Sequence, residues 1–138
     1  AQTGAVAAAE VNFTVTDQYP AAMALYQTYR KRWLARYWQS LGLRIFVDLN
    51  VGEQHRETNL LGVPSGWAAW ITRGYTKQLD ALRREYEAAC EHAGTREVLF
   101  VVYGGGAQVK ECARDIGAVW IPEQRDVAKG KEKAYGET

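Results

Sequence analysis

Short runs of apolar, strand-forming residues alternate with longer helix-forming stretches along most of this chain. The predicted strands span residues 11–16, 43–51, 67–72, 98–103 and 118–121. The predicted helices span residues 21–41 and 75–93, with a third, short helix that ends at Ile116. This alternation is typical of an α/β fold in which about five mostly parallel strands pack against three helices. An open Rossmann-like sheet and a partial (β/α) barrel both satisfy the pattern, whereas five strands are too few for a closed eight-stranded barrel.

Composition places the chain among ordinary single-domain globular proteins. It has 138 residues, 47% of them hydrophobic and 24% charged, and a formal net charge of +1. The longest uncharged apolar runs are too short to cross a bilayer, and two cysteines are too few for a disulfide scaffold. We therefore expect a cytoplasmic protein of the host cell without a membrane partner. We read residues 1–10 as a leader or a connection to missing sequence, 11–123 as a single α/β domain and 124–138 as a polar tail.

Polar residues follow most of the predicted strands, which is where parallel sheets bind their ligands. The candidate catalytic residues at these positions are Asp17, Asp48 and Arg73, and the candidate ligand-binding residues are Asn50, His55, Arg56 and Tyr103. Asp17, Asp48 and Glu123 carry hard oxygen ligands of the kind that Mg²⁺ prefers, so Mg²⁺ is a candidate cofactor, although no metal-binding motif is present. The competing interpretation is that the acidic residues only cap helices and close turns.

Arg30 is the most unusual residue of the first predicted helix. It falls near the centre of an apolar arc, where a buried guanidinium needs an anionic partner such as Asp17 or Asp48. We therefore include Arg30 among the candidate catalytic residues, as a side chain aimed at an anion. A purely structural ion pair, or an arginine that reaches out to solvent, is the alternative.

The same helix is also a candidate nucleic-acid interface. The segment from residue 18 to 47 contains five basic residues and no acidic one, interleaved with aromatic residues. Most of the rings fall on the apolar arc, so only Lys31, Arg32 and Arg36 are expected to face solvent and contact nucleic acid. A plain solvated helix face explains the same pattern.

A run of glycines follows the fourth predicted strand. Backbone amides of Gly104, Gly105 and Gly106 lie before a helix and could cradle a phosphate. The run matches neither of the common nucleotide-binding glycine motifs, and a tight turn would need glycines as well.

Several short motifs resemble domain-of-unknown-function family 4417. They are Asn12-Phe-Thr-Val-Thr-Asp17, Tyr29-Arg-Lys-Arg-Trp33, Arg36-Tyr-Trp-Gln39, Gly42-Leu-Arg-Ile-Phe-Val-Asp48 and Val101-Val-Tyr103-Gly104. The resemblance covers about residues 11 to 121 and implies an α/β fold in a bacteriophage, prophage or mobile-element context. It implies no reaction, because the family is itself uncharacterised.

Three functions remain open at this stage. The first is a nucleic-acid-associated protein of a phage or mobile element, acting on DNA or RNA in replication or host takeover. The second is a metal-assisted phosphoester hydrolase with its site at the carboxyl ends of the strands. The third is a non-catalytic assembly domain, for which self-association or a larger parent chain would supply the partner.

Overall fold

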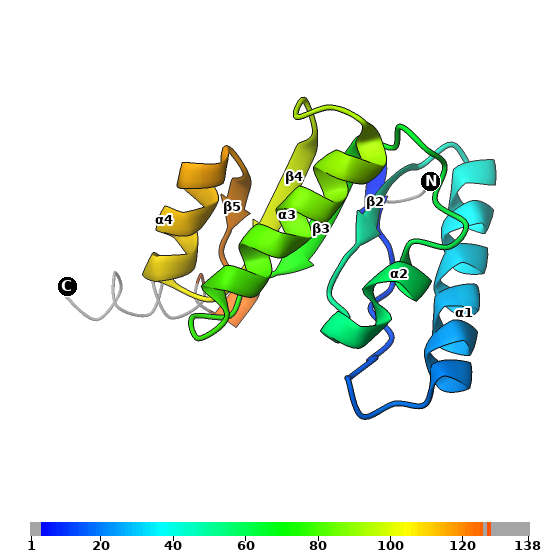
Figure 1. The fold of residues 1–138 in the computed structure, drawn as a ribbon. Coiled ribbons are helices and arrows are strands. Elements are labelled where there is room, and N and C mark those ends of the chain that lie inside the picture. The colour runs from blue at the N-terminus through cyan, green and yellow to red at the C-terminus, as the bar shows by residue number, and fades with distance from the viewer. Residues whose placement is uncertain (1–3, 126, 128–138) are drawn as a thin grey trace.

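A computed structural model describes residues 4–125 and 127 of the chain (Figure 1). Its elements are β1 (Ala7–Ala9), α1 (Ala21–Ser40), β2 (Arg44–Asp48), η1 (Glu53–His55), α2 (Arg56–Asn59), β3 (Ala69–Arg73), α3 (Leu79–Ala93), β4 (Leu99–Tyr103), α4 (Ala107–Ile116) and β5 (Val119–Ile121). The predicted α/β fold is therefore confirmed. Most of the expected 124–138 tail lies outside the described residues.

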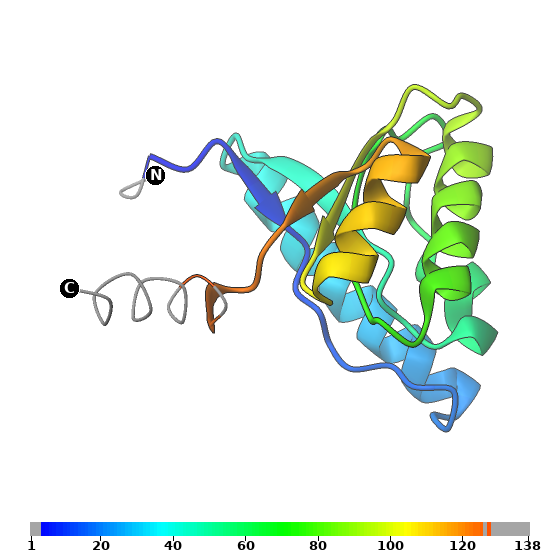
Figure 2. The ribbon, with the colours of Figure 1, turned by 90° about the vertical axis from the view of Figure 1, so that its left-hand side faces the viewer.

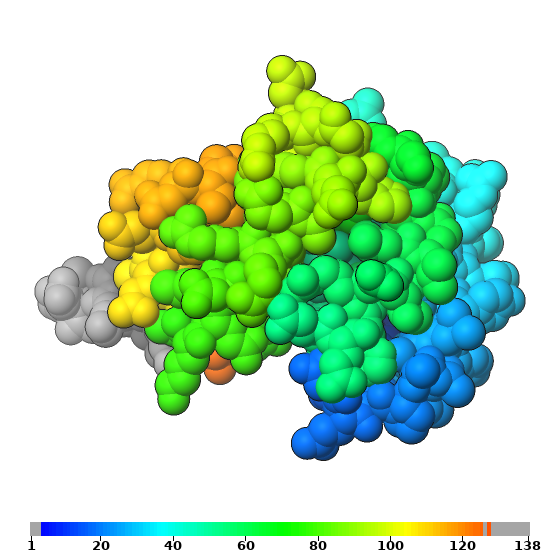
Figure 3. Space-filling view, in the orientation of Figure 1, coloured from blue at the N-terminus to red at the C-terminus, as the bar shows by residue number. Residues whose placement is uncertain are grey.

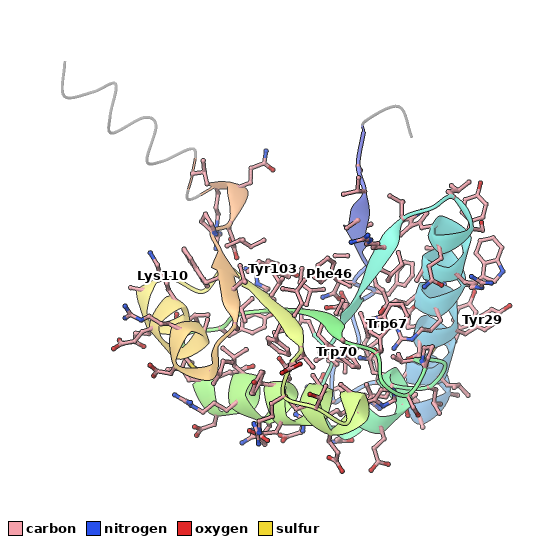
Figure 4. The ribbon with its side chains drawn as sticks, turned by 90° about the horizontal axis from the view of Figure 1, so that it is seen from above. Tyr29, Phe46, Trp67, Trp70, Tyr103 and Lys110 are labelled. Carbon is pink, nitrogen blue, oxygen red and sulfur yellow. The ribbon has the colours of Figure 1, made fainter. Side chains whose placement is uncertain are left out.

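The strands form one parallel sheet in the order β1-β2-β3-β4-β5. The order of the strands in the sheet is the same as their order in the chain. Right-handed crossovers between successive strands therefore place all the connecting helices on one face of the sheet. Figures 2 and 4 show this arrangement, with the sheet curled and the helices on its convex side. The fold is thus an open half-barrel.

The core lies between the sheet and the helices. Trp70, Phe100 and Val102 alternate with outward residues along β3 and β4, so their side chains all point toward α3 and α4. There they meet Leu82 and Val109 in one buried cluster. Phe46 and Tyr103 lie on the concave side of the sheet, opposite Trp70 (Figure 4). Because the strands are all parallel, their carboxyl ends meet at one edge.

The first strand differs from its prediction. We expected it over residues 11–16, but β1 lies within the expected leader and pairs with the start of β2. Segment 11–16 instead leaves the sheet and crosses its carboxyl edge, where the backbone oxygen of Val15 accepts a hydrogen bond from Gly52 at 2.7 Å. The alternation in this segment comes from the buried Val15 between the exposed Thr14 and Thr16. It resembles a strand pattern, although the segment pairs with no described strand.

The irregular stretch expected over residues 51–66 also differs. It contains the 3-10 helix η1 and the α-helix α2, and α2 brings the number of α-helical elements in the described part of the chain to four instead of three. These elements are only three and four residues long, too short for helical periodicity to be visible in sequence.

Candidate functional site

A cleft of about 1120 Å³ opens at the carboxyl edge of the sheet. Its walls come from segment 12–17, the loop after β2, the loop after β3, the first turns of α3 and the end of β4. Five of the predicted site residues line it: Asp17, Asn50, Arg56, Arg73 and Tyr103. The structure therefore brings these five residues together at one edge of the sheet, and their catalytic or binding roles stay predictions. Asp48, His55, Arg30 and the three glycines are not among the residues that line the cleft.

Asp17 stabilises the loops that form one wall of the cleft. Its Oδ1 accepts a hydrogen bond from the backbone N–H of Gln54 at 2.9 Å. Gly52 packs so closely against it that a Cβ there would lie 2.5 Å from the Asp17 backbone nitrogen. The contacts of Asp17 are those of a loop-bracing side chain, as the alternative interpretation of the sequence proposed.

Arg73 is held from two directions. One terminal nitrogen lies 2.5 Å from Oε1 of Glu123, and the guanidinium carbon lies 5.4 Å from the centre of the Tyr75 ring. Tyr103 is its register partner on β4 and faces the same side of the sheet. Burial raises the pKa of the Tyr103 phenol, with a smaller opposing effect from a hydrogen bond to Asn12. The phenol is therefore a neutral hydrogen-bonding group throughout the physiological range.

Asp48 lies beneath the cleft in a buried charge network that joins α1, β2, α2 and the residue that follows β1. Lys31 of α1 donates a hydrogen bond to the backbone oxygen of Asp48 at 3.0 Å, and its ammonium lies 3.7 Å from the Asp48 carboxylate. Lys31 also donates to the side-chain oxygen of Asn59. Burial lowers the pKa of Lys31 and raises the pKa of Asp48, while their mutual attraction opposes both shifts.

A second ion pair completes this network. Arg32 donates to both carboxylate oxygens of Glu10, at 2.7 and 2.8 Å, and also to the backbone oxygen of Asn59. Glu10 in turn accepts a hydrogen bond from the backbone N–H of Asp48 at 3.0 Å. Burial raises the pKa of Glu10, and the charge of Arg32 opposes that shift. Two acids and two bases thus balance one another inside the protein.

These contacts correct the sequence prediction for α1. Lys31 and Arg32 were expected to face solvent, but Lys31 is only 3% exposed and Arg32 is largely buried. Arg30 was expected inside the apolar arc, yet it is exposed, with its guanidinium 4.1 Å above the Phe13 ring. The prediction of an exposed Arg36 is confirmed. The helix therefore buries the side that was predicted to be exposed, and we call this difference the inversion of α1. It arises because the buried carboxylates of Glu10 and Asp48 need cationic partners.

The inversion leaves aromatic side chains on the outside of the molecule. We call the solvent-facing side of α1 the aromatic face, which consists of Tyr26, Tyr29, Trp33 and Tyr37. Each of these side chains is more than half exposed, and Trp33 stacks on Tyr37 with ring centres 6.0 Å apart. Tyr29 points away from the sheet (Figure 4).

The glycine run forms a tight turn between β4 and α4. All three glycines have positive φ angles, between 75° and 86°. A Cβ on Gly105 would lie 2.7 Å from the backbone oxygen of Gly74, and Thr76 donates to the Gly105 oxygen at 2.5 Å. The turn and its close packing account for the glycines, and phosphate binding by them stays a prediction.

His55 is buried beside the cleft rather than within it. It ends η1, and its Nε2 has no hydrogen-bonding partner among the described residues. Within residues 4–125 and 127, no three His, Cys, Asp or Glu side chains converge as a metal site requires. None of the helices described there is long and apolar enough to cross a membrane.

Glu85 of α3 is a cleft residue that the sequence prediction missed. Thr72 donates a hydrogen bond to its Oε2 at 2.7 Å. Burial raises the pKa of Glu85 to about 8, against smaller opposing effects of Thr72 and Arg56. The signal was present in sequence, because Glu85 lies three residues after Leu82 and four before Ala89, both of which are buried. An acid on the apolar side of a helix is a candidate for proton transfer or ligand binding.

Comparison with known proteins shows one relationship. A family model described as Domain of unknown function (DUF4417) matches residues 2–116. No curated protein and no solved structure matches the chain. The match covers most of the half-barrel, from β1 to the end of α4. The chain therefore belongs to the DUF4417 family, domains of unknown function.

Proposed function

We propose that this protein binds single-stranded nucleic acid through the aromatic face of α1. The observation that carries the proposal is the exposure of four large rings on a helix without acidic residues: Tyr29 is 63% exposed and Trp33 is 58% exposed. Burying such rings would be favourable, so their exposure needs a partner with flat apolar surfaces. Unpaired bases provide these surfaces, and each stacked base contributes about 1–3 kcal/mol.

The charges on this face favour an anionic partner over a second copy of the chain. Arg30 and Arg36 flank the rings, and no acidic residue occurs between residues 18 and 47. A symmetric helix-to-helix dimer would bring the arginines of both copies together without carboxylates from this segment. A phosphate backbone would instead pair with them, at an affinity that falls as salt rises.

We propose that the protein acts in the cytoplasm of a host cell, in the replication or host-takeover functions of a phage or mobile element. The support is the acid-free aromatic face together with the sequence resemblance. A phosphoester hydrolase is a weaker candidate, because Arg30 and Asp48 lie outside the cleft and the described residues lack a cluster of acids for Mg²⁺.

The test is binding of a short fluorescent oligothymidylate at low salt, measured by anisotropy. We expect Trp33→Ala to weaken binding about 5- to 150-fold, which corresponds to one lost stacking contact. Leu99→Ala is the matched control, since it removes an apolar side chain of similar exposure from β4, away from α1. We also expect duplex DNA to bind more weakly than the single strand. Equal binding by the two variants, or no binding of the native protein at low salt, would show that the proposal is wrong.

A further inference from the structure

A second surface feature lies between α2 and α3, and none of its lining residues belongs to the aromatic face. Arg56 and Arg84 line the carboxyl-edge cleft and also a neighbouring hollow of about 630 Å³. The two arginines therefore stand where the two depressions meet. Figure 3 views the side of the molecule on which α2 and α3 lie next to each other.

The two guanidinium groups share a single carboxylate. Oε1 of Glu53 lies 2.7 Å from Nε of Arg84 and 3.7 Å from a terminal nitrogen of Arg56. Glu53 is more than half exposed, so water competes for it. The hollow is also lined by Glu57, Glu87 and Glu91, but among the described residues only Glu53 lies within ion-pair distance of either arginine, and Glu87 is paired with Arg96. Two arginines that share one exposed carboxylate have unused donors, and paired guanidinium groups suit the oxygens of a phosphate.

Glu85, a largely buried acid of the same cleft, adds little negative charge at neutral pH. Glu85 projects from α3 into the same cleft and is hydrogen-bonded to Thr72 of β3. Its pKa is about 8, so the carboxyl is mainly protonated below that pH. The charged groups that act on it are Arg56 of α2, Arg84 of α3 and the more deeply buried Asp48 of β2.

We propose that Arg56 and Arg84 form a binding site for a phosphate monoester, and that the Glu53 carboxylate occupies it until the ligand displaces it. The phosphate oxygens would bridge the two guanidinium groups as Glu53 does. The protonated Glu85 carboxyl forms the adjacent wall and carries a proton that it can share with a phosphate oxygen. This site is independent of the aromatic face of α1, because the two share no residue.

Sulfate is the probe for the first test, since its charge does not change near neutral pH. NMR titration of the arginine Nε–Hε signals measures its binding. We expect Arg84→Ala to weaken sulfate binding at least about 10-fold and Arg83→Ala to leave it unchanged. Arg83 is the matched control: it is the preceding residue of α3, is equally exposed, pairs with Asp115 and is not among the lining residues of either depression. Equal sulfate binding by the two variants would refute the site.

The competing carboxylate and the neighbouring acid give two further tests. Glu53→Gln should tighten sulfate binding several-fold, because the internal competitor loses its charge. In the native protein, sulfate binding should weaken about fivefold to tenfold as pH rises through about 8, when Glu85 becomes negative. Glu85→Gln should remove most of that dependence. Unchanged affinity in Glu53→Gln would contradict the displacement, and an unchanged pH profile in Glu85→Gln would contradict the role of Glu85.

Two sources can supply the phosphate group. Tighter binding of a free mononucleotide than of sulfate would indicate a small-molecule ligand. Tighter binding of an oligothymidylate with a 5′-phosphate than of one without it, lost in Arg84→Ala, would indicate the end of a strand. Failure of both ligands to compete with sulfate would overturn the assignment to phosphate monoesters. Failure of Trp33→Ala to affect oligonucleotide binding would leave these sulfate results untouched, so the two proposals fail separately.

Discussion

Helices α1 and α3 differ in the side chains that they bury, although both pack on the same convex face of the sheet. Helix α3 buries Leu82, Ala89 and Cys90, and its acidic and arginine side chains other than Glu85 face solvent. Helix α1 buries Ala24, Thr28, Lys31 and Ala35, and the four rings of its aromatic face are exposed to solvent. The first is an ordinary amphipathic helix, whereas the second has the reverse arrangement.

The difference lies in what each helix meets. Helix α3 covers the apolar side chains of β3 and β4, including Phe100, which packs edge-on against Tyr86. Helix α1 covers the end of β2, where Asp48 and the neighbouring Glu10 are buried. Buried carboxylates without cationic partners are costly, so Lys31 and Arg32 are drawn inward and the rings are left outside. A helix whose apolar residues are exposed in this way is a strong candidate for a binding surface.

The largest expected effect comes from breaking the buried charge pair of α1. Lys31→Met fills a similar volume but leaves Asp48 without its cation, and we expect a loss of about 3–5 kcal/mol in the free energy of unfolding. The measurement is urea denaturation. In the double variant with Asp48→Asn, much of the stability should return, because no unpaired charge remains. A loss below about 1 kcal/mol in Lys31→Met would show that α1 is not held by this pair.

The next effect concerns the ordinary helix. Leu82→Ala removes a buried side chain of α3 from the cluster around Phe100, and we expect a loss of about 2–5 kcal/mol in urea denaturation. Lys31→Met should be rescued by removing the charge of Asp48. The stability lost in Leu82→Ala should not be restored by removing any charge on α3, because that loss comes from packing. A loss within about 0.5 kcal/mol would mean that the packing described for α3 does not stabilise the fold.

The smallest expected effect on the free energy of unfolding comes from a substitution on the exposed side of α1. Trp33→Ala removes a large ring from α1, but this ring is exposed, so the free energy of unfolding should change by no more than about 0.5 kcal/mol. The same variant should lose oligonucleotide affinity, so stability and binding should separate. A loss of stability comparable to that of Leu82→Ala would mean that Trp33 packs inside the protein and that α1 is not inverted.

Much of the fold could be predicted from local sequence. The apolar runs that become β2, β3, β4 and β5 and the helices α1, α3 and α4 were recognised, because each has a clear period or an ending at Gly42, Gly94 or Pro122. The first strand could not be found, since Ala7, Ala8 and Ala9 have no alternation and form a strand only by pairing with β2. The four-residue helix α2 was also missed, because it is too short to show a helical period and its formation depends on tertiary contacts.

The candidate site was predicted in part. Strand ends at one edge of a parallel sheet placed Asp17, Asn50, Arg73 and Tyr103 on one cleft, as the pattern indicated. The arginine pair at Arg56 and Arg84 was not predicted, because it depends on how α2 lies beside α3. Nor could spacing reveal that Asp48 lies beneath the cleft with Lys31 as its partner.

The amino-acid sequence by itself determined the parallel α/β class, the position of most elements and the edge at which polar residues gather. These properties depend on local periodicity and on chain order, which the sequence states directly. Only the tertiary structure decided which side of α1 is buried, because that choice depends on the carboxylates of Glu10, directly after β1, and Asp48 of β2, which are distant in sequence. The exposed rings and the paired arginines are both consequences of such long-range contacts.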